Sequence, residues 1–323
     1  SYILDASIAS DQYKELYELL KDPSLGARII DSRWSAFGRT DLVEFEKDHD
    51  LKVIFVDGGA GTRMYRFDGN FTSNSKVYQL KNSTAYFPYY FTNKNNVLIM
   101  GPGGGVDVLI ALMAGVNHIT AVEVNPETVN IVRDYSEYNG GIYTKYDNVH
   151  VFIDEGRSFL KRTSVKYDAI ILNIPVTKTA QGVGGYSLAE NYLFTIDSFG
   201  DYLDHLEDQG YLVIVAHNRL ELYKLTAIAF KVLQARGGSD QAFMRHIVST
   251  EMHHSHFPVF ILKKAAFTNG EVVKIYAKSN ELGFTPVYFP YINSEEFDPI
   301  LAELAEEKVA LDKVTSLFQE YGY

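Results

Sequence analysis

Residues 97–107 read Val97-Leu-Ile-Met-Gly-Pro-Gly-Gly-Gly-Val-Asp107, and residues 121–126 read Ala121-Val-Glu-Val-Asn-Pro126. The first run predicts a buried strand, a glycine turn and the start of a helix, and the second predicts the next strand. Glycines at such a turn let the chain bend sharply and bring backbone N–H groups close to a ligand. Glu123 lies 22 residues beyond Gly101, where an acidic side chain can accept both hydroxyls of a ribose. Together the two runs predict a site for an adenosine-type cofactor.

The glycine pattern also bears on the kind of cofactor. A dinucleotide site prefers a third glycine at the start of the helix, but position 106 is Val. This disfavours an NAD-dependent oxidoreductase and favours S-adenosylmethionine. A glycine-rich turn in an α/β protein without a cofactor remains the simpler alternative, because a lone glycine cluster is a weak signal.

Composition limits the classes of function. The chain has 323 residues, 46% of them hydrophobic, a formal net charge of −11 and no cysteine. The negative charge argues against a nucleic-acid groove; it suits cationic ligands such as polyamines but serves solubility equally well. The absence of cysteine removes disulfides, thiolate metal ligands and a thiol nucleophile, and fits a cytoplasmic location. No run approaches the ~20 apolar residues of a membrane span. Because the chain begins at Ser1, we expect a piece of a longer protein.

The patterns predict two units. Residues 1–92 are expected to hold an N-terminal helix and a small β unit, and residues 93–323 an α/β domain with a helical C-terminal tail. Strands are expected at 28–31, 41–45, 52–56, 97–100, 119–123, 149–153, 168–173, 211–216, 246–250 and 258–262, and helices at 10–21, 127–138, 192–206, 220–234 and 271–282. Alternating strands and helices imply a mostly parallel, doubly wound sheet whose ligands bind at the carboxyl ends of the strands.

The order of these motifs resembles the spermidine synthase family, the polyamine aminopropyltransferases, which share the class I methyltransferase (Rossmann-like) fold. Besides the glycine run and Ala121-Val-Glu123, the resemblance rests on Val53-Ile-Phe-Val-Asp-Gly58, Val151-Phe-Ile-Asp-Glu-Gly-Arg-Ser-Phe-Leu160 and Tyr167-Asp-Ala-Ile-Ile-Leu172. Three further runs look like an uncharacterised bacterial subgroup in which the domain follows transmembrane helices: Arg33-Trp-Ser-Ala-Phe-Gly-Arg-Thr-Asp41, Asp57-Gly-Gly-Ala-Gly-Thr62 and Tyr186-Ser-Leu-Ala-Glu-Asn-Tyr192. This second resemblance implies the cytoplasmic portion of a membrane protein.

The family resemblance implies roles for the cofactor residues. The glycine loop, formed by Gly101, Gly103, Gly104 and Gly105, would surround the methionine-derived part of the cofactor. Gly104 stands where the family uses an Asp to bind the amine of decarboxylated S-adenosylmethionine. Glu123 would bind the ribose, and Glu155, with Asp154 beside it, would accept the adenine amino group.

The same resemblance implies an altered acceptor site. The family places an Asp after the fourth strand of the sheet to bind and deprotonate the amine, and this chain has Asn173 there. An amide cannot take a proton near neutral pH, and a positioned general base contributes roughly 10²–10⁴ in rate. Thr62 and Arg63 occupy the neighbourhood of the family's amine-binding Gln. Asp57 is either a substrate-side carboxylate or simply part of a turn. These differences disfavour spermidine synthesis itself.

Other residues offer replacements. Residues 177–186 have the glycines and hydroxyls of a mobile lid. Tyr186 and Glu190 follow it, with Glu190 as a candidate base; the alternative is a packed aromatic and a charge that favours the start of a helix. We expect no metal site, because His253, His254 and His256 fit a surface turn better than a ligand set.

Two functions stay open. The first is an S-adenosyl-nucleotide-dependent transferase that moves an aminopropyl or methyl group to an unidentified small-molecule acceptor. The second is a non-catalytic sensor or interaction domain that binds the nucleotide without turnover. A deep acceptor pocket would favour the enzyme and a filled pocket the sensor. A homodimer is also expected, and nucleic acid is not expected as a partner.

Overall fold

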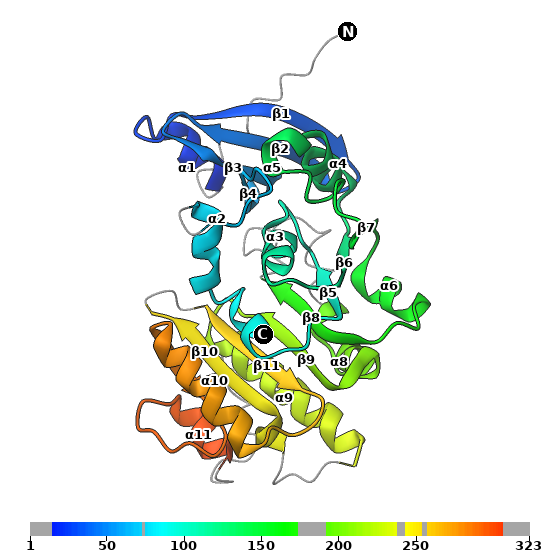
Figure 1. The fold of residues 1–323 in the computed structure, drawn as a ribbon, viewed down its shortest axis with the longest axis vertical. Coiled ribbons are helices and arrows are strands. Elements are labelled where there is room, and N and C mark those ends of the chain that lie inside the picture. Colours follow the sequence, from blue (N-terminus) through cyan, green and yellow to red (C-terminus); the bar gives the residue numbers. More distant parts are fainter. Residues whose placement is uncertain (1–14, 73–74, 174–191, 238–242, 254–256, 306–323) are drawn as a thin grey trace.

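The computed structural model describes residues 15–72, 75–173, 192–237, 243–253 and 257–305. Within these residues a four-stranded sheet lies above an eight-stranded sheet along the long axis of the molecule (Figure 1). Among the helices of the described residues, none has both the length and the apolar character needed to cross a membrane.

The smaller sheet is antiparallel in the order β1-β2-β3-β4. Its strands are β1 (Ala27–Ser35), β2 (Gly38–Phe45), β3 (Asp48–Val56) and β4 (Gly59–Tyr65). Helix α1 (Glu15–Lys21) packs under it through Leu16, in a cluster with Val43 and Phe55. The three expected strands are confirmed, although each is longer than expected. The predicted helix over 10–21 is observed from Glu15, and its first residues lie outside the described residues.

The fourth strand of this sheet was not predicted, because its Gly-Ala-Gly beginning is typical of a turn. Tertiary packing explains the glycines: a Cβ on Gly61 would lie 2.7 Å from the ring of Phe55. The expected turn before the strand is present, since Asp57 and Gly58 have φ values of 50° and 74°. Two successive left-handed residues are typical of a tight β-hairpin.

The larger sheet has the order β12-β10-β11-β9-β8-β5-β6-β7. Its strands are β5 (Asn96–Met100), β6 (His118–Glu123), β7 (Val149–Ile153), β8 (Tyr167–Asn173), β9 (Leu206–Val215), β10 (Ile247–Met252), β11 (Pro258–Lys263) and β12 (Phe284–Tyr288). Neighbours from β7 to β9 pair in parallel, whereas β11 is antiparallel to β9 and β10. This confirms the predicted α/β fold with a mostly parallel sheet and a small N-terminal β unit. The expectation that β9 starts at residue 211 was wrong, and β12 was not predicted.

Helices connect the strands of the larger sheet. They are α3 (Val106–Met113), α4 (Pro126–Asp134), α5 (Ser136–Asn139), α6 (Gly156–Arg162), α8 (Ile196–His205), α9 (Arg219–Ala235) and α10 (Asn269–Glu281). The segment before β5 forms α2 (Lys76–Gln79) and two 3-10 turns, η1 (Leu80–Asn82) and η2 (Phe87–Tyr90). A third turn, η4 (Phe243–His246), precedes β10. The predicted helix 127–138 is divided into α4 and α5, and of the predicted tail the described part forms α11 (Pro299–Ala305).

The order in which the chain adds strands to the larger sheet reverses direction at β5. Strands β5, β6 and β7 follow one another outward, and the chain then returns to place β8 on the other side of β5. At such a reversal the two flanking connections leave in opposite directions, and the crevice between them is the usual ligand site of an open α/β sheet. Gly101 follows β5 and Asn173 ends β8, so both lie at this point.

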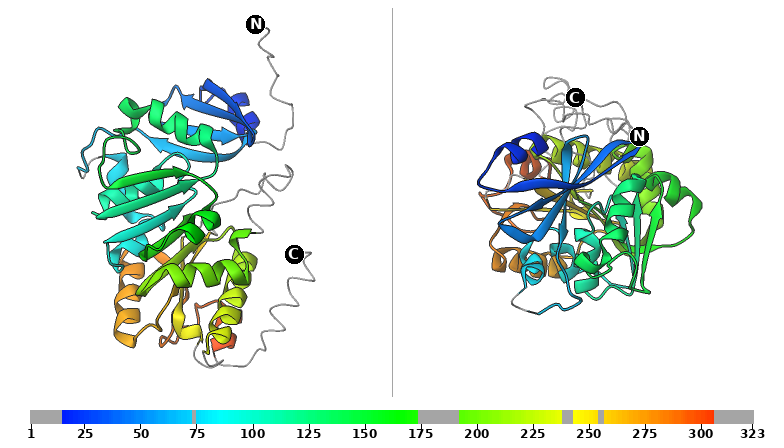
Figure 2. Two further views of the ribbon diagram at one scale, coloured as in Figure 1. Left: turned by 90° about the vertical axis from the view of Figure 1, so that its right-hand side faces the viewer. Right: turned by 90° about the horizontal axis from the view of Figure 1, so that it is seen from above.

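The small sheet is attached to the same edge. Helix α4 packs against β1 and β2 (Figure 2). Asn125 caps α4 by accepting a 3.0 Å hydrogen bond from the Glu127 N–H, and its own amide donates to the Thr40 hydroxyl at 3.1 Å. Both Thr40 and Asn125 are buried. The β unit is therefore joined to the carboxyl end of β6, beside the predicted cofactor residues.

Candidate functional site

The glycine loop packs directly against strand β4. A Cβ on Gly104 would lie 2.2 Å from the carbonyl oxygen of Arg63, and one on Gly103 would lie 2.4 Å from Thr62 Oγ1. Gly103 also has a left-handed φ of 52°, which side chains other than glycine rarely adopt. No side chain fits at position 104 while β4 stays in place. This explains in physical terms why the loop has glycine where the family resemblance implies an aspartate.

Two hydrogen bonds fix the loop in this position. The Gly104 N–H donates to Thr62 Oγ1 at 2.9 Å, and the buried Tyr143 hydroxyl donates to the Gly103 carbonyl at 3.0 Å. Thr62 was predicted to contact the substrate; the structure places its side chain on the glycine loop. In this position Thr62 orients the glycine loop.

Glu123 joins the glycine loop to the end of β6. It is 8% exposed, and its carboxylate accepts the Gly103 N–H at 3.1 Å and the Asn125 N–H at 3.0 Å. Burial raises the pKa of this carboxyl group, and the backbone hydrogen bonds partly oppose that rise. The Val124 N–H also contributes to that opposition, and an ionised carboxylate has about four acceptor positions. Acceptor capacity therefore remains for a ribose hydroxyl, and the residues present fit an adenosyl group.

Asp154 and Glu155 follow β7 beside Glu123. The Asp154 N–H donates to the Glu123 carbonyl at 3.0 Å, and the Asp154 side chain pairs with Arg162. The Glu155 carboxylate caps α6, accepting from the N–H groups of Arg157 at 2.9 Å and Ser158 at 2.7 Å. Each Glu155 oxygen thus retains acceptor capacity for an adenine amino group. Large apolar side chains stand exposed just before the pair, at Phe152 and Ile153.

Asp57 lies in the hairpin between β3 and β4. Its Oδ1 accepts the Arg39 N–H at 2.9 Å, and its own N–H donates to the Arg39 carbonyl at 2.7 Å. A Cβ on Gly38 would lie 2.3 Å from Asp57 Oδ2, so this carboxylate is packed closely against the neighbouring hairpin. Of the two readings of Asp57, the geometry favours the turn.

The remaining sequence candidates are not placed by the structure. Tyr186, Glu190 and the predicted lid over 177–186 lie outside the described residues, as do His254 and His256. Within the described residues no three His, Asp or Glu side chains are gathered closely enough to hold a metal ion.

Asn173 contacts a carboxylate that sequence reasoning did not select. Its Nδ2 donates to Asp107 Oδ1 at 2.5 Å, which links the end of β8 to the first turn of α3. The Asn173 Oδ1 atom is buried and has no partner in the part of the chain that the structure describes. Burial raises the pKa of Asp107 from an ordinary 3.8 to about 6, although the Asn173 hydrogen bond opposes the rise. The sequence offered one signal for Asp107: an acidic residue immediately after the glycine loop.

The raised pKa predicts how Asp107 affects stability. Because the folded protein binds this proton more tightly than the unfolded chain, stability falls as the pH rises from 3.8 to about 6. At about 1.4 kcal/mol for each pH unit, the loss above that window approaches ~3 kcal/mol. We therefore expect Asp107→Asn to be more stable than the original protein at pH 8 and equally stable below pH ~4. Urea unfolding at both pH values measures this, and a difference that does not change with pH would contradict it.

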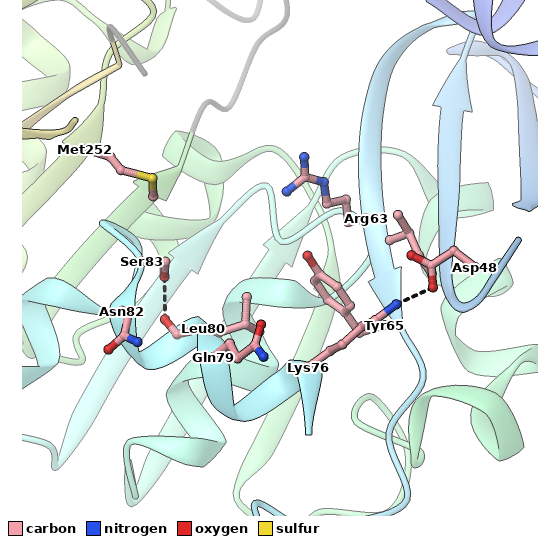
Figure 3. Close-up of a pocket in the computed structure, with 10 residues that line it drawn as sticks. Asp48, Arg63, Tyr65, Lys76, Gln79, Leu80, Asn82, Ser83 and Met252 are labelled. Carbon is pink, nitrogen blue, oxygen red and sulfur yellow. Dashed lines mark hydrogen bonds and ion pairs between the residues drawn. The ribbon is translucent and has the colours of Figure 1, made fainter. Parts of the chain in front are cut away.

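A separate cavity of about 340 Å³ lies beside β4 (Figure 3). Arg63 and Tyr65 line it together with α2, η1 and Met252 at the end of β10, and Lys76 at its edge pairs with Asp48 at 2.5 Å. The lining includes no residue of the glycine loop, and neither Glu123 nor Asn173. This cavity therefore does not decide between a deep and a filled acceptor pocket.

Comparison with known proteins identifies the family. A family model described as "Spermine/spermidine synthase domain" matches residues 81–267, more than half of the chain. The protein belongs to this family. The matched range contains the glycine loop, Glu123, Asp107 and Asn173, so every described residue of the candidate site outside the β unit lies within the family domain.

Curated relatives match a shorter part of the chain. A polyamine aminopropyltransferase of Pectobacterium carotovorum subsp. carotovorum (strain PC1) is 30% identical over 133 residues, which are 41% of this chain and 43% of the relative. One of Buchnera aphidicola subsp. Acyrthosiphon pisum (strain APS) is 27% identical over 124 residues, 38% of this chain and 40% of the relative. The chain thus matches less than half the length of these relatives.

Solved structures support the fold. A spermidine synthase in complex with the transition state analogue AdoDATO aligns with a TM-score of 0.53 and 16% identity, covering 87% of this chain and 89% of that one. The spermidine synthase of Thermotoga maritima aligns with a TM-score of 0.51 and 15% identity, covering 91% and 87%. These similarities confirm the predicted spermidine synthase-like fold.

Proposed function

We propose that this protein binds an S-adenosyl nucleotide at the edge formed by the glycine loop, Glu123 and Glu155, and transfers a group from it to a small-molecule amine. The observation that carries the proposal is the Glu123 carboxylate, which accepts the Gly103 N–H and keeps acceptor capacity for a ribose hydroxyl. The family, and the aminopropyltransferase names of the curated relatives, support a transferase.

The described residues would bind and orient the cofactor. Glu123 would accept the ribose hydroxyls and Glu155 the adenine amino group, while Thr62 and Tyr143 keep the glycine loop in place. The bound cofactor supplies a carbon attached to a positively charged sulfur, which leaves as a neutral thioether. Holding an acceptor next to that carbon provides much of the rate by proximity alone.

The transferred group is either aminopropyl or methyl. The names of the relatives favour aminopropyl transfer from decarboxylated S-adenosylmethionine. One observation favours methyl transfer from intact S-adenosylmethionine as the second candidate. Because the Arg63 carbonyl leaves no room for a side chain at Gly104, this loop offers no carboxylate to the amine of the decarboxylated form.

A sensor without turnover is the alternative from another class. Asn173 supports it, because an amide at the end of β8 cannot accept a proton from an amine. The two classes differ in product formation: a sensor binds the nucleotide and leaves it unchanged.

Product analysis tests the proposal. The protein is incubated with each form of the cofactor and with 1,3-diaminopropane, 1,4-diaminobutane or 1,5-diaminopentane, and nucleotide products are identified by mass spectrometry. Aminopropyl transfer yields methylthioadenosine, and methyl transfer yields S-adenosylhomocysteine. We expect methylthioadenosine from the decarboxylated form. Nucleotide binding without either product would support the sensor instead.

Three further expectations belong to this proposal. We propose a division near residue 92, which falls between η2 and β5. A cytoplasmic location, with attachment to an upstream membrane segment, and a homodimer also stay predictions.

A further inference from the structure

The ends of β8 and η2 and the start of α3 carry three polar groups whose hydrogen-bonding capacity the described residues do not use in full. Asn173 Oδ1 and the hydroxyl of Tyr89 are buried without a hydrogen-bond partner among the described residues. For the Asp107 carboxylate the described residues provide one hydrogen bond, at Oδ1. Buried polar atoms without partners are rare in folded proteins, and each calls for a physical reason.

These three groups favour the same kind of ligand. The amide oxygen of Asn173 can only accept hydrogen bonds. The Asp107 carboxyl group, when it is ionised, can also only accept them. Burial raises the pKa of Tyr89 well above its ordinary value, and the Asp107 charge adds to the rise, so the phenol stays neutral and can donate or accept. A ligand that satisfies this set must bring several N–H donors and fits best with a positive charge. A primary amine in its ammonium form has three donors and that charge.

We propose that Asp107, oriented by the amide of Asn173, is the acceptor-side carboxylate that binds a primary amine and takes its proton during group transfer. This inference rests on the proposed function, because the amine must meet an S-adenosyl nucleotide to react. Asn173 is then a positioning residue: its Nδ2 fixes Asp107 Oδ1, and its Oδ1 offers a further acceptor to the amine.

Position in the fold supports this assignment. Asp107 lies two residues beyond Gly105, the last residue of the glycine loop, and Asn173 ends the strand on the far side of the chain reversal. The Asp107 carboxylate therefore lies at the same edge of the sheet as Gly103 and Glu123, which we propose bind the nucleotide. A charge in the first turn of α3 is favourable for the helix dipole, but a dipole role alone does not require a buried amide on β8 as partner.

The chemical step balances without another reactant. The bound ammonium gives one proton to the Asp107 carboxylate, and the free nitrogen lone pair forms a bond to the carbon next to sulfur. The carbon–sulfur bond breaks, and its electron pair stays on sulfur as a neutral thioether. The new nitrogen keeps its two remaining protons as a secondary ammonium, and Asp107 returns its proton to water. A carboxyl group with a pKa near 6 is about a hundredfold better as a proton acceptor than one at 3.8.

Titration calorimetry tests the proposal in two stages. Methylthioadenosine is first titrated into the protein, and the three diamines are then titrated into the saturated complex between pH 5 and 8. The amines stay protonated over this range, so a change in affinity reports on the protein. We expect affinity to fall about tenfold for each pH unit below 6, as Asp107 takes up its proton. Failure at the first stage would count against the proposed function, whereas failure of all three diamines at the second would overturn only the present inference.

Variants distinguish a role of Asp107 in amine binding from a purely structural role. Asp107→Asn is expected to bind methylthioadenosine like the original protein, to bind the amine at least tenfold more weakly at pH 8, and to lose the pH dependence. The double variant Asp107→Asn with Asn173→Asp returns a carboxylate to the same pair and is expected to restore amine binding and its pH dependence. Glu137→Gln removes an equal charge from an exposed residue paired with Lys145 and should change neither. If Asp107→Asn keeps the original amine affinity and pH profile, Asp107 is structural and the inference is overturned.

Discussion

Replacing Glu123 with alanine is expected to weaken binding of S-adenosylmethionine about 100-fold or more. The variant removes the acceptor of the Gly103 and Asn125 N–H groups, and with it the acceptor capacity left for a ribose hydroxyl. A hydrogen bond to a charged group contributes up to about 3 kcal/mol, which corresponds to that loss of affinity, and the glycine loop loses its bond to Glu123 as well. Titration calorimetry at pH 7.5 provides the measurement.

Matched variants make this result specific. Glu123→Gln keeps the size of the side chain but turns an N–H donor toward one of the two backbone donors, so it should also bind weakly while remaining folded. Glu127→Ala changes a carboxylate in the first turn of α4 and should alter the affinity less than twofold. Original affinity in both Glu123 variants would show that the ribose is bound elsewhere.

The second large effect concerns the close packing of the glycine loop. Gly104→Ala places a methyl group 2.2 Å from the Arg63 carbonyl oxygen, and neither backbone can yield without moving β4 or the loop. Overpacking of this kind costs about 3 kcal/mol. We expect a lower urea midpoint by that amount and weaker cofactor binding, because the Gly104 bond to Thr62 is displaced as well.

Gly270→Ala is the matched control. Gly270 lies in the first turn of α10, and a Cβ there would meet no atom within 4 Å. Alanine restricts the unfolded chain more than glycine, so this variant should be unchanged or more stable by up to ~1 kcal/mol. Equal destabilisation by both substitutions would mean that the contact between β4 and the glycine loop is not what requires glycine at position 104.

Local patterns were sufficient to predict the cofactor edge. Gly101, Glu123 and Glu155 each lie at or just beyond the carboxyl end of a strand, and neighbouring parallel strands bring such positions to one edge of the sheet. Strands β5 to β11 of the larger sheet were predicted for the same reason, since their apolar runs are strong. The structure adds the hydrogen bond between Gly103 and Glu123, which shows that these predicted residues meet.

Features that depend on tertiary contacts were not predicted. Strand β4 has glycine at position 61 because the ring of Phe55 leaves no room for a side chain, and a sequence pattern does not contain that information. Strand β12 contains Pro286, which is unusual inside a sheet, but β12 lies at its edge where proline is tolerated. Asp107 gains its significance from Asn173, 66 residues further along the chain. Each omission thus involves a partner distant in sequence.

The structure gives Asn173 a carboxylate as its partner. Sequence comparison emphasised the missing carboxylate at Asn173, whereas the structure pairs that amide with Asp107. On our proposal the carboxylate is supplied by the helix after the glycine loop instead of by the strand. The loss of one Asp is then compatible with catalysis, and product analysis distinguishes this arrangement from a sensor.

The central claim, that this edge of the sheet binds an S-adenosyl nucleotide, is tested most directly by titrating the original protein with S-adenosylmethionine and with its decarboxylated form. We predict saturable one-to-one binding of the decarboxylated form, with the heat of binding lost in Glu123→Ala. Absence of saturable binding for both forms, or equal binding by Glu123→Ala, would contradict the account.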